Sequence, residues 1–213
     1  MMIPLKVGIV GYGKVGKIRH ECINNNPYSE VIGICDIDEN VLNNSSVVYY
    51  TDYNKLLDAC PDMIFVCTYN RDIPKISIDA IARGIHVFSE KPPGRTLEDV
   101  KAIYDTAVEN PGVKVKFGFN HRYHEVVIEA KSIVDSGRLG KVMWLRGIYG
   151  KAGGPGYDNG WRNNRDISGG GILIDQGIHM LDLFRYFSGE YDEVKSFINS
   201  SYWKVDVEDN VFA

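Results

Sequence analysis

Two groups of residues in this sequence have the types and spacing that acid–base chemistry requires. The first is Lys91, which follows the apolar run 85–88 and precedes two prolines. Pro92 restricts the backbone of the residue before it, so the ammonium group of Lys91 is expected to be held at the end of a strand. Such a group can donate a hydrogen bond to an oxygen that becomes negatively charged in a reaction. A solvated lysine in a turn is the structural alternative.

The second group is Asp175, His179 and Asp182, whose spacings of four and seven residues predict one face of a helix over 170–187. The residues around them are mostly apolar, so polar side chains on this largely buried helix need partners or a ligand. Histidine exchanges protons near neutral pH, and a neighbouring carboxylate can orient its ring. We therefore expect His179 to act as a base. A core histidine satisfied by either aspartate is the alternative.

Metal binding is a further possible use of the same three side chains, because histidine and carboxylates at helical spacing bind zinc or iron. The ammonium group of Lys91 would oppose a divalent ion, and only His121 and His124 remain as candidate ligands from elsewhere. The sequence therefore predicts no metal site.

A glycine-rich turn near the N-terminus predicts a dinucleotide site. An apolar strand ends in Gly11-x-Gly13-x-x-Gly16, and a helix is predicted over 14–25. Gly11 permits the tight turn, Gly13 lets a pyrophosphate approach the backbone, and Gly16 lets the helix pack on the strand. The first amides of the helix would then point at the phosphates.

An acidic residue stands where this type of site needs one. Asp36 follows the next apolar run, 31–35, and would accept hydrogen bonds from the hydroxyls of an adenosine ribose. Its charge would repel the additional phosphate of NADP, so the sequence favours NAD. The alternative is an aspartate that caps a helix beginning near Asp38.

Strands and helices alternate along the first part of the chain, which predicts a doubly wound parallel sheet with its ligand crevice at the carboxyl ends of the strands. After about residue 118 the pattern changes to a helix at 122–136 ending at Gly137, a strand at 141–149, a glycine-rich loop and a strand within 194–203. We therefore expect domains at 1–118 and 119–213, the second truncated. The first domain's strands are predicted at 5–10, 31–35, 47–50, 63–67, 85–88 and 113–117, and its helices at 14–25, 52–59, 72–83 and 96–109.

The composition is that of an ordinary globular chain. Its 213 residues are 44% hydrophobic, and its 24 basic and 28 acidic residues give a net charge of −4, which gives no support to nucleic-acid or membrane-surface binding. Neither a signal peptide nor a membrane span is predicted, so we expect a cytoplasmic protein. None of the four cysteines lies at zinc or redox spacing, and we interpret them as structural thiols: Cys22, Cys35, Cys60 and Cys67.

Five motifs occur in a fixed order: Gly11-x-Gly13-x-x-Gly16, Glu90-Lys91-Pro92, Gly118-Phe119-Asn120-x-Arg122, Trp161-Arg162 and Ser168-Gly-Gly-Gly-x-Leu173-x-Asp175-x-Gly177-x-His179-x-x-Asp182. In these the chain resembles the glucose-fructose oxidoreductase, inositol dehydrogenase and rhizopine catabolism (Gfo/Idh/MocA) family of NAD(P)-dependent oxidoreductases. It departs from the family at Tyr69 and Ile73, where a proline and a histidine are usual. We expect altered packing beside the nicotinamide at that point.

The resemblance implies a Rossmann domain, then an α+β domain with an open, mostly antiparallel sheet through which family members usually form homo-oligomers. It implies that Lys91, Asp175 and His179 are catalytic. The residues expected to contact the cofactor, from the resemblance and the glycine turn together, are Gly11, Gly13, Lys14, Val15, Gly16, Asp36, Thr68, Asn70, Glu90, Lys91, Asn120 and Arg162.

The predicted function is transfer of a hydride between a secondary alcohol of a sugar, polyol or nucleotide sugar and the nicotinamide. His179 would take the hydroxyl proton, Lys91 would stabilise the alkoxide, and Asp175 would orient the substrate or the imidazole. Side chains that suggest a site for a hydroxyl-rich ring follow in the loop region: Tyr149, Tyr157, Asn159, Trp161 and Asn163. Two alternatives stay open, a glycosidase or lyase that uses NAD transiently and a regulator that only binds NAD.

Overall fold

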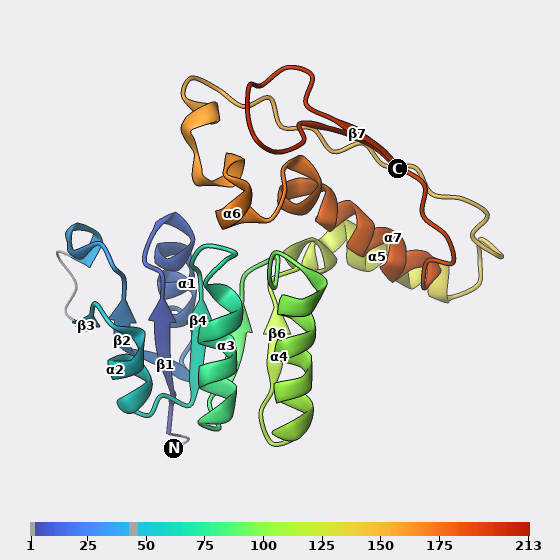
Figure 1. Ribbon diagram of the computed structural model, residues 1–213. Helices are drawn as coiled ribbons and strands as arrows, with labels where there is room; N and C mark the ends of the chain where they lie inside the picture. The colour runs from blue at the N-terminus through green and yellow to red at the C-terminus, as the bar shows by residue number, and fades with distance from the viewer. Residues whose placement is uncertain (1–2, 43–46) are drawn as a thin grey trace. The chain divides into compact units, whose positions relative to one another are not determined.

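The computed structural model describes residues 3–42 and 47–213. The chain divides into two compact units, Met1–Gly118 and Phe119–Ala213 (Figure 1). The first unit is built on a six-stranded sheet in the order β3-β2-β1-β4-β5-β6, and every neighbouring pair is parallel. Its strands are β1 (Leu5–Val10), β2 (Ser29–Cys35), β3 (Val48–Tyr50), β4 (Met63–Val66), β5 (His86–Ser89) and β6 (Val115–Phe117).

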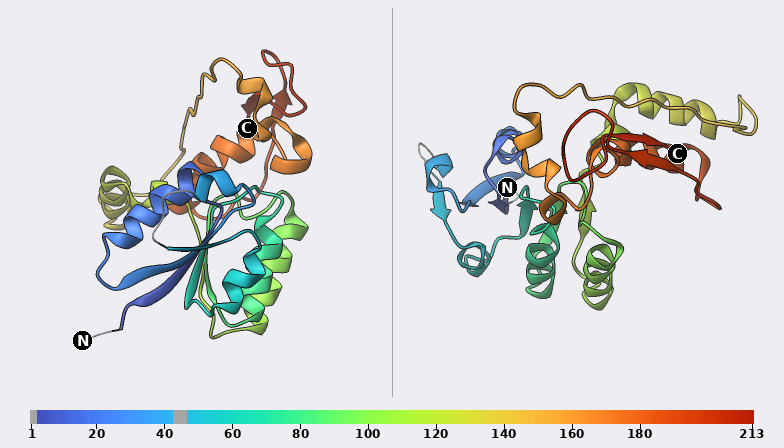
Figure 2. Two further views of the ribbon diagram at one scale, coloured as in Figure 1. Left: turned by 90° about the vertical axis from the view of Figure 1, so that its left-hand side faces the viewer. Right: turned by 45° about the horizontal axis from the view of Figure 1, so that its top comes forward.

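Helices cover both faces of this sheet, as parallel strands with crossover connections require. In the left view of Figure 2, α1 lies on one face, and α3 and α4 lie on the other. The bounds of all four predicted helices and six predicted strands are correct to within two residues. The helices are α1 (Lys14–Asn24), α2 (Tyr53–Asp58), α3 (Ile73–Ala82) and α4 (Leu97–Glu109), with a short 3-10 helix, η1, at Glu39–Leu42.

The main core lies between the sheet and helices α2, α3 and α4. Its apolar residues include Leu56, Ile64 and Val66, which are fully buried, and two serines, Ser77 on α3 and Ser89 on β5, are also fully buried in this unit. On the opposite face a smaller cluster of Val7, Ile9 and Ile23 packs beneath α1. Burial of apolar surface on both faces therefore holds the strand ends in place.

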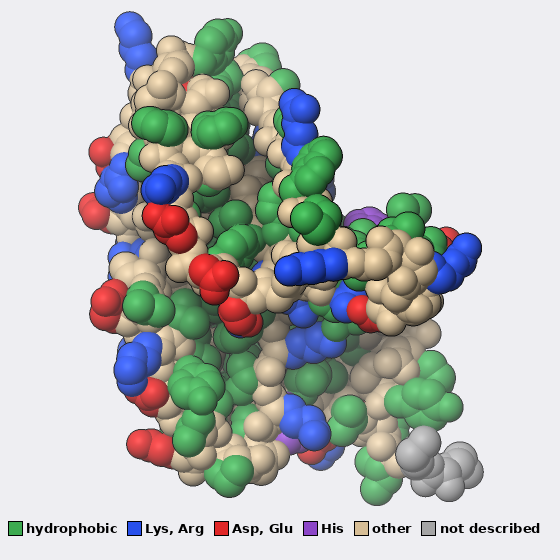
Figure 3. Space-filling view, turned by 90° about the vertical axis from the view of Figure 1, so that its right-hand side faces the viewer, with side chains coloured by type: hydrophobic (Ala, Val, Ile, Leu, Met, Phe, Trp, Pro, Cys, Tyr) green, Lys and Arg blue, Asp and Glu red, His purple; other side chains and the backbone are tan. Residues whose placement is uncertain are grey.

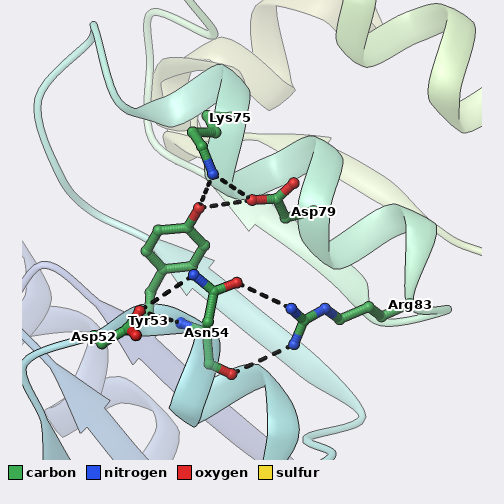
Figure 4. A network of polar contacts seen from close by, with 6 residues as sticks. All are labelled: Asp52, Tyr53, Asn54, Lys75, Asp79 and Arg83. Atoms are coloured by element: carbon green, nitrogen blue, oxygen red, sulfur yellow. Dashed lines mark hydrogen bonds and ion pairs between the residues drawn. The ribbon is translucent and has the colours of Figure 1, made fainter.

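A polar network joins α2 to α3 at the surface of the unit (Figure 4). The hydroxyl of Tyr53 donates to Asp79 Oδ2 at 2.6 Å and accepts from Lys75, which also pairs with Asp79 at 2.9 Å. Arg83 reaches back from the end of α3 to the side-chain oxygen of Asn54 at 2.9 Å. These contacts fasten two helices that the apolar core already positions.

The second unit contains shorter elements and long stretches without regular structure. The helix predicted at 122–136 is confirmed as α5, although its first turn is a separate 3-10 helix. Antiparallel strands β7 and β8 pair Phe197 with Phe212. Its elements are η2 (Asn120–Tyr123), α5 (Glu125–Asp135), η3 (Tyr157–Asn159), η4 (Trp161–Asn163), α6 (Arg165–Ser168), η5 (Leu173–Gly177), α7 (Ile178–Ser188), β7 (Phe197–Asn199) and β8 (Asn210–Phe212).

The strand predicted at 141–149 is wrong, and the strand predicted within 194–203 is reduced to three residues. A strand needs a neighbour for its backbone hydrogen bonds, and no described strand pairs with 141–149. Apolar side chains there remain exposed, including Trp144 at 76%. Figure 3 shows hydrophobic side chains at the surface, between charged ones, on the face that it displays.

The helix predicted at 170–187 is divided into a π-helical turn, η5, and the α-helix α7. A π-helix has more residues per turn than an α-helix, so Asp175 does not share the regular spacing expected for the three polar residues. The helix is also less buried than predicted, because His179 is the one fully buried residue described in α7. Within the residues that the structure describes, no helix has the length and apolar character needed to cross a bilayer.

Candidate functional site

The glycine turn after β1 has the geometry that its sequence predicts. Gly11 has a φ of +88°, and a Cβ atom there would lie 2.5 Å from the backbone oxygen of Cys67. A Cβ on Gly16 would lie 2.1 Å from the oxygen of Gly11, so the helix can approach the turn only without a side chain. A Cβ on Gly13 would meet no atom within 4 Å. Two glycines are therefore required by the fold, whereas Gly13 leaves its outer side open.

The start of α1 is suited to an anion. Gly13 is its N-cap, no described side chain caps the helix, and its first turn has no acidic residue. Lys14 and Val15 are exposed at this end. Uncapped amides at a helix start carry partial positive charge and can donate to phosphate oxygens. The open side of Gly13 and these donors fit the pyrophosphate of a dinucleotide.

Asp36 lies at the end of β2 and contacts the glycine turn directly. Its Oδ2 accepts the amide hydrogen of Tyr12 at 2.6 Å, and its Oδ1 accepts that of Asp38 at 3.0 Å. The second contact is a local turn contact and not the helix cap that the structural alternative expects, because the cap of η1 is Asp38, whose Oδ1 accepts the amide hydrogen of Asn40 at 3.0 Å. The first places the carboxylate between the turn and the neighbouring strand end, where an adenosine ribose would lie.

The ends of β4 and β5 carry the next predicted residues. Thr68 is half-buried and Asn70 is 5% exposed, just after β4. Lys91 is half-buried just after β5, and its peptide bond to Pro92 is cis. All of these lie at the carboxyl edge of the sheet, as does the glycine turn.

Glu90 precedes Lys91 and is bound by a residue that the sequence analysis did not single out. Arg19, in the second turn of α1, donates from Nε to Glu90 Oε1 at 2.7 Å, and its Nη2 lies 2.5 Å from the same oxygen. A Cβ on Gly118 would lie 2.8 Å from Glu90 Oε2. Gly118 of the motif therefore makes room for this carboxylate.

None of the cysteines forms a disulfide in the described residues, where Cys35 is buried and Cys67 half-buried, whereas Cys22 and Cys60 are exposed. Burial raises the pKa of Cys35 to about 12, with Asp36 and Asp52 adding to the rise. Burial also raises the pKa of Cys67 to about 12, with Glu90 adding to the rise and Arg19 opposing it. Neither thiol is ionised near neutral pH, so neither is suited to nucleophilic chemistry.

His179, in the second unit, lies in a stack of aromatic rings. Its imidazole is 5% exposed. The ring of His121 stacks on it with centroids 4.0 Å apart and planes 16° apart, and Phe119 meets it edge-on at 6.2 Å. Tyr149 lies 5.7 Å from His121 and 6.3 Å from His179. The plane of the His179 ring is therefore fixed by its neighbours.

The sequence indicates His121 only as a candidate metal ligand and does not predict its contact with His179. The stack forms because η2 lies against α7. No local spacing relates residues 58 positions apart (179 − 121), so the sequence contains no signal for this pair. Among the described residues no group of three or more His, Cys, Asp or Glu side chains could hold a metal ion.

Asp175 is surrounded by cationic and amide groups. Its carboxylate pairs with Arg162 at 3.2 Å and with Lys151 at 3.4 Å, and Gln176 donates to it at 2.9 Å. Its side chain is 13% exposed. Both oxygens of this carboxylate therefore have donors, Oδ1 from Arg162 and Oδ2 from Lys151 and Gln176. Lys151 was missed because a lysine in a glycine-rich loop has no distinctive spacing.

Asp182 was expected to share a helical face with Asp175 and His179, but its carboxylate forms an ion pair with an arginine of η2. Arg122 of the Asn120-x-Arg122 motif binds both of its oxygens, at 2.8 Å from Nε and 2.5 Å from Nη2. The guanidinium also lies over the ring of Tyr186, 4.8 Å from its centroid. Asp182 thus joins η2 to α7, while Asn120 itself is exposed. This ion pair supports the segment that carries His121.

The loop residues predicted to surround a sugar ring are divided between structural contacts and the ring stack. Tyr157 packs on Trp203 with centroids 4.9 Å apart, and buried Asn163 donates to the backbone oxygen of Tyr157. Trp161 lies under the guanidinium of Arg162, 4.4 Å from it. Tyr149 contacts the stack around His179. Most of these side-chain contacts therefore stabilise the conformation of the loop region.

Comparison with known proteins matches both units to one family. Residues 5–119 match the oxidoreductase family with an NAD-binding Rossmann fold, and residues 127–213 match the GFO/IDH/MocA C-terminal domain. The chain belongs to the GFO/IDH/MocA family. The resemblance stated from the motifs is thus confirmed, and the first unit is an NAD-binding Rossmann domain.

Relatives in this family act on sugars and cyclic polyols according to their names. D-glucoside 3-dehydrogenase of Escherichia coli (strain K12) is 32% identical over 96% of this chain and 60% of its own length. Myo-inositol 2-dehydrogenase of Lactobacillus plantarum superposes with a TM-score of 0.82 at 31% identity, over 93% of this chain and 60% of that one. Levoglucosan dehydrogenase in complex with NADH and levoglucosan gives a TM-score of 0.90 at 26% identity, over 98% and 62%. The chain therefore spans about three fifths of the length of these relatives.

Proposed function

We propose that this chain is part of an NAD-dependent dehydrogenase that oxidises a secondary hydroxyl group on a pyranoside or cyclic polyol. One observation carries the proposal: both units, and not only the nucleotide-binding one, align with a D-glucoside 3-dehydrogenase over 96% of the chain. The buried imidazole of His179 in the second unit supports it, because a nucleotide-binding module alone has no need of such a group.

The residues of the first unit would hold the cofactor. The amides at the start of α1 would bind the pyrophosphate beside Gly13, and Asp36 would accept hydrogen bonds from the adenosine ribose. The charge of Asp36 opposes a phosphate at that position, which favours NAD over NADP. When bound, NAD supplies a two-electron acceptor for the hydrogen on the carbinol carbon.

The proton chemistry would belong to Lys91, Asp175 and His179. His179 would accept the hydroxyl proton at a ring nitrogen, and the stack with His121 would keep that nitrogen in a fixed plane. Lys91 would donate a hydrogen bond to the developing alkoxide. Asp175, held by Arg162 and Lys151, would orient the substrate rather than accept a proton.

The test uses the full-length protein with NAD and a panel of methyl glucosides, levoglucosan, inositols and nucleotide sugars. We expect net formation of NADH with at least one glycoside or cyclic polyol. His179→Ala should lower kcat by about a hundredfold to ten-thousandfold and leave NADH affinity nearly unchanged. His86→Ala, at the amino end of β5, is the matched control and should have no effect.

Two results would contradict the proposal. Unchanged turnover in His179→Ala would remove this residue from the reaction. Conversion of a glycoside without net formation of NADH would instead support an enzyme that oxidises and then re-reduces its substrate. Binding of NADH with no conversion of any compound would support a regulator.

A further inference from the structure

The Arg19–Glu90 ion pair joins the two parts of the first unit that a dinucleotide would contact. Arg19 lies in the helix whose first turn would bind the pyrophosphate, and Glu90 lies at the end of β5. Both donor contacts of the guanidinium converge on one oxygen, Oε1, at 2.7 and 2.5 Å. The side chains are 23% and 16% exposed, so the pair is largely screened from water.

Other contacts fix both partners of the pair. The guanidinium of Arg19 lies over the ring of Phe88, 5.2 Å from its centroid, and Phe88 stacks on Phe65 at 4.8 Å. On the other side, Glu90 Oε2 occupies the space that a side chain at position 118 would need. The Glu90 carboxylate is therefore held between α1 and the end of β6, and its position depends on Arg19.

The order of the strands indicates which half of the cofactor would lie near this carboxylate. Asp36, on β2, is on one side of β1, and Glu90, on β5, is two strands away on the other side. Neighbouring strands are about 4.8 Å apart, so the end of β5 lies about 10 Å from the glycine turn. A dinucleotide with its adenosine ribose at Asp36 would therefore extend its nicotinamide riboside toward Glu90.

We propose that Arg19 is a positioning residue that sets the Glu90 carboxylate for the nicotinamide riboside half of NAD. This inference rests on the proposed function, because it requires the dinucleotide to bind at the glycine turn. Arg19 itself does not contact the cofactor in this scheme. It keeps the Glu90 carboxylate in one place, so that its oxygens are ready to accept hydrogen bonds from that riboside.

Three ligands of different length, NADH, ADP-ribose and ADP, distinguish this role from a purely structural contact. ADP-ribose contains the adenosine, the pyrophosphate and a second ribose without nicotinamide, and ADP ends at the phosphates. In the full chain, Arg19→Met should raise the Kd for NADH by about tenfold or more while changing the Kd for ADP by less than about twofold. ADP-ribose should lie between them, because it retains the second ribose.

Further variants check that the effect passes through Glu90. Glu90→Gln should give a similar NADH-specific loss, and the double variant should be no worse than either single variant, because the two residues act as one unit. Arg19→Lys keeps the charge and should recover part of the affinity. Arg83→Met removes an arginine ion pair with Asp58 at the opposite edge of the sheet and should leave all three affinities unchanged.

Thermal unfolding without ligand identifies variants that fail to fold. If Arg19→Met does not fold, the affinities of Arg19→Lys and Glu90→Gln for the three ligands are compared instead. An equal loss of NADH and ADP affinity, or no loss of either, would overturn the role of Arg19 and leave the proposed function intact. Failure of the unaltered chain to bind ADP or NADH would overturn both proposals.

Discussion

The two units of this chain are held together by different kinds of contact. In the first, a continuous apolar core packs on a parallel sheet, and its central side chains are fully buried. In the second, Val207 is the one apolar side chain among the buried residues that the structure describes, which are otherwise polar or glycine: Asn163, Ser168, Gly170, Gly171 and His179. The first unit is therefore stabilised chiefly by the hydrophobic effect, and the second by directed hydrogen bonds and ion pairs.

In the second unit, carboxylates at 208–209 bind backbone amides and hold segments of the chain together. Glu208 Oε1 accepts the amide hydrogens of Gly171 at 2.9 Å and Leu173 at 3.2 Å, at the start of the segment that carries Asp175. A Cβ on Gly171 would lie 1.9 Å from the backbone oxygen of Glu208. Directed contacts position the segment that carries Asp175 with few apolar side chains, and we expect its stability to depend more on charge than that of the Rossmann unit.

A cavity in the core of the first unit should have the largest effect on stability. Ile64→Ala removes a fully buried side chain of β4 and should lower the free energy of unfolding by about 2 to 5 kcal/mol. All three tryptophans lie in the second unit, so tryptophan fluorescence follows that unit while circular dichroism follows both. Urea unfolding recorded by both methods should show the loss mainly in the circular dichroism signal.

The same substitution at an exposed site is the control. Ile128→Ala, on α5, should change the free energy of unfolding by less than about 0.5 kcal/mol because that side chain is 51% exposed. Equal shifts of both signals in Ile64→Ala would mean that the units unfold together, and would weaken the comparison.

The next effect concerns the ring that stacks on His179. His121→Ala should lower kcat of the full-length enzyme by about tenfold to a hundredfold, because the imidazole of His179 loses the surface that fixes its plane. His121→Phe preserves a flat ring and should recover most of the rate. NADH affinity should be the same in both variants. If His121→Phe is as slow as His121→Ala, the polar atoms of His121 matter rather than its shape.

Acid should loosen the second unit before the first. Burial alone would raise the pKa of Asp209, but the amides of Ser201, Trp203 and Tyr202 donate to its carboxylate and hold the pKa well below its usual range. A folded pKa below the unfolded one contributes stability above about pH 3.9, and this contribution is lost as the pH falls through the folded pKa. Because the group is near the surface, we expect about 0.5 to 1 kcal/mol.

Tryptophan fluorescence, to which all three tryptophans of the second unit contribute, measures this loss between about pH 5 and pH 2. Asp209→Asn should begin with the lower stability and show little further change over the same range. A variant that titrates like the parent chain would show that another carboxylate controls the transition.

The smallest effect is expected at the surface network of Figure 4. Tyr53→Phe removes the hydroxyl that bonds Asp79 and Lys75 but keeps the ring, and the Lys75–Asp79 pair remains. We expect a loss of about 0.5 kcal/mol in the free energy of unfolding. Tyr104→Phe, on α4, removes an exposed hydroxyl and is the control. A loss above about 2 kcal/mol would show that polar contacts also govern the first unit.

The sequence predicted the first unit well because its signals are local. Alternating apolar runs and helix signals define each element, and Thr96 caps α4 by accepting the amide hydrogen of Asp99, as its spacing predicts. The glycine turn likewise follows from three positions within six residues. Parallel pairing then follows from the alternation itself.

The second unit was predicted less well because its contacts are distant in sequence. The residues around 141–149 do not show that this segment lacks a partner among the described strands. The residues around Asp182 likewise do not indicate its ion pair with Arg122, 60 positions earlier. The Arg19–Glu90 pair was missed for the same reason, with 71 positions between its members. Periodicity predicts which face of an element is buried, but not which polar groups meet across the fold.

The bond from the Tyr12 amide to Asp36 bears on any attempt to redesign the coenzyme preference of this protein. Replacing Asp36 with a neutral residue to admit the 2′-phosphate of NADP would also remove the acceptor that ties the glycine turn to β2. The turn would lose order at the same step that relieves the repulsion. A successful redesign would have to supply a substitute acceptor for that amide, so a single exchange at this position is expected to weaken the binding of both coenzymes.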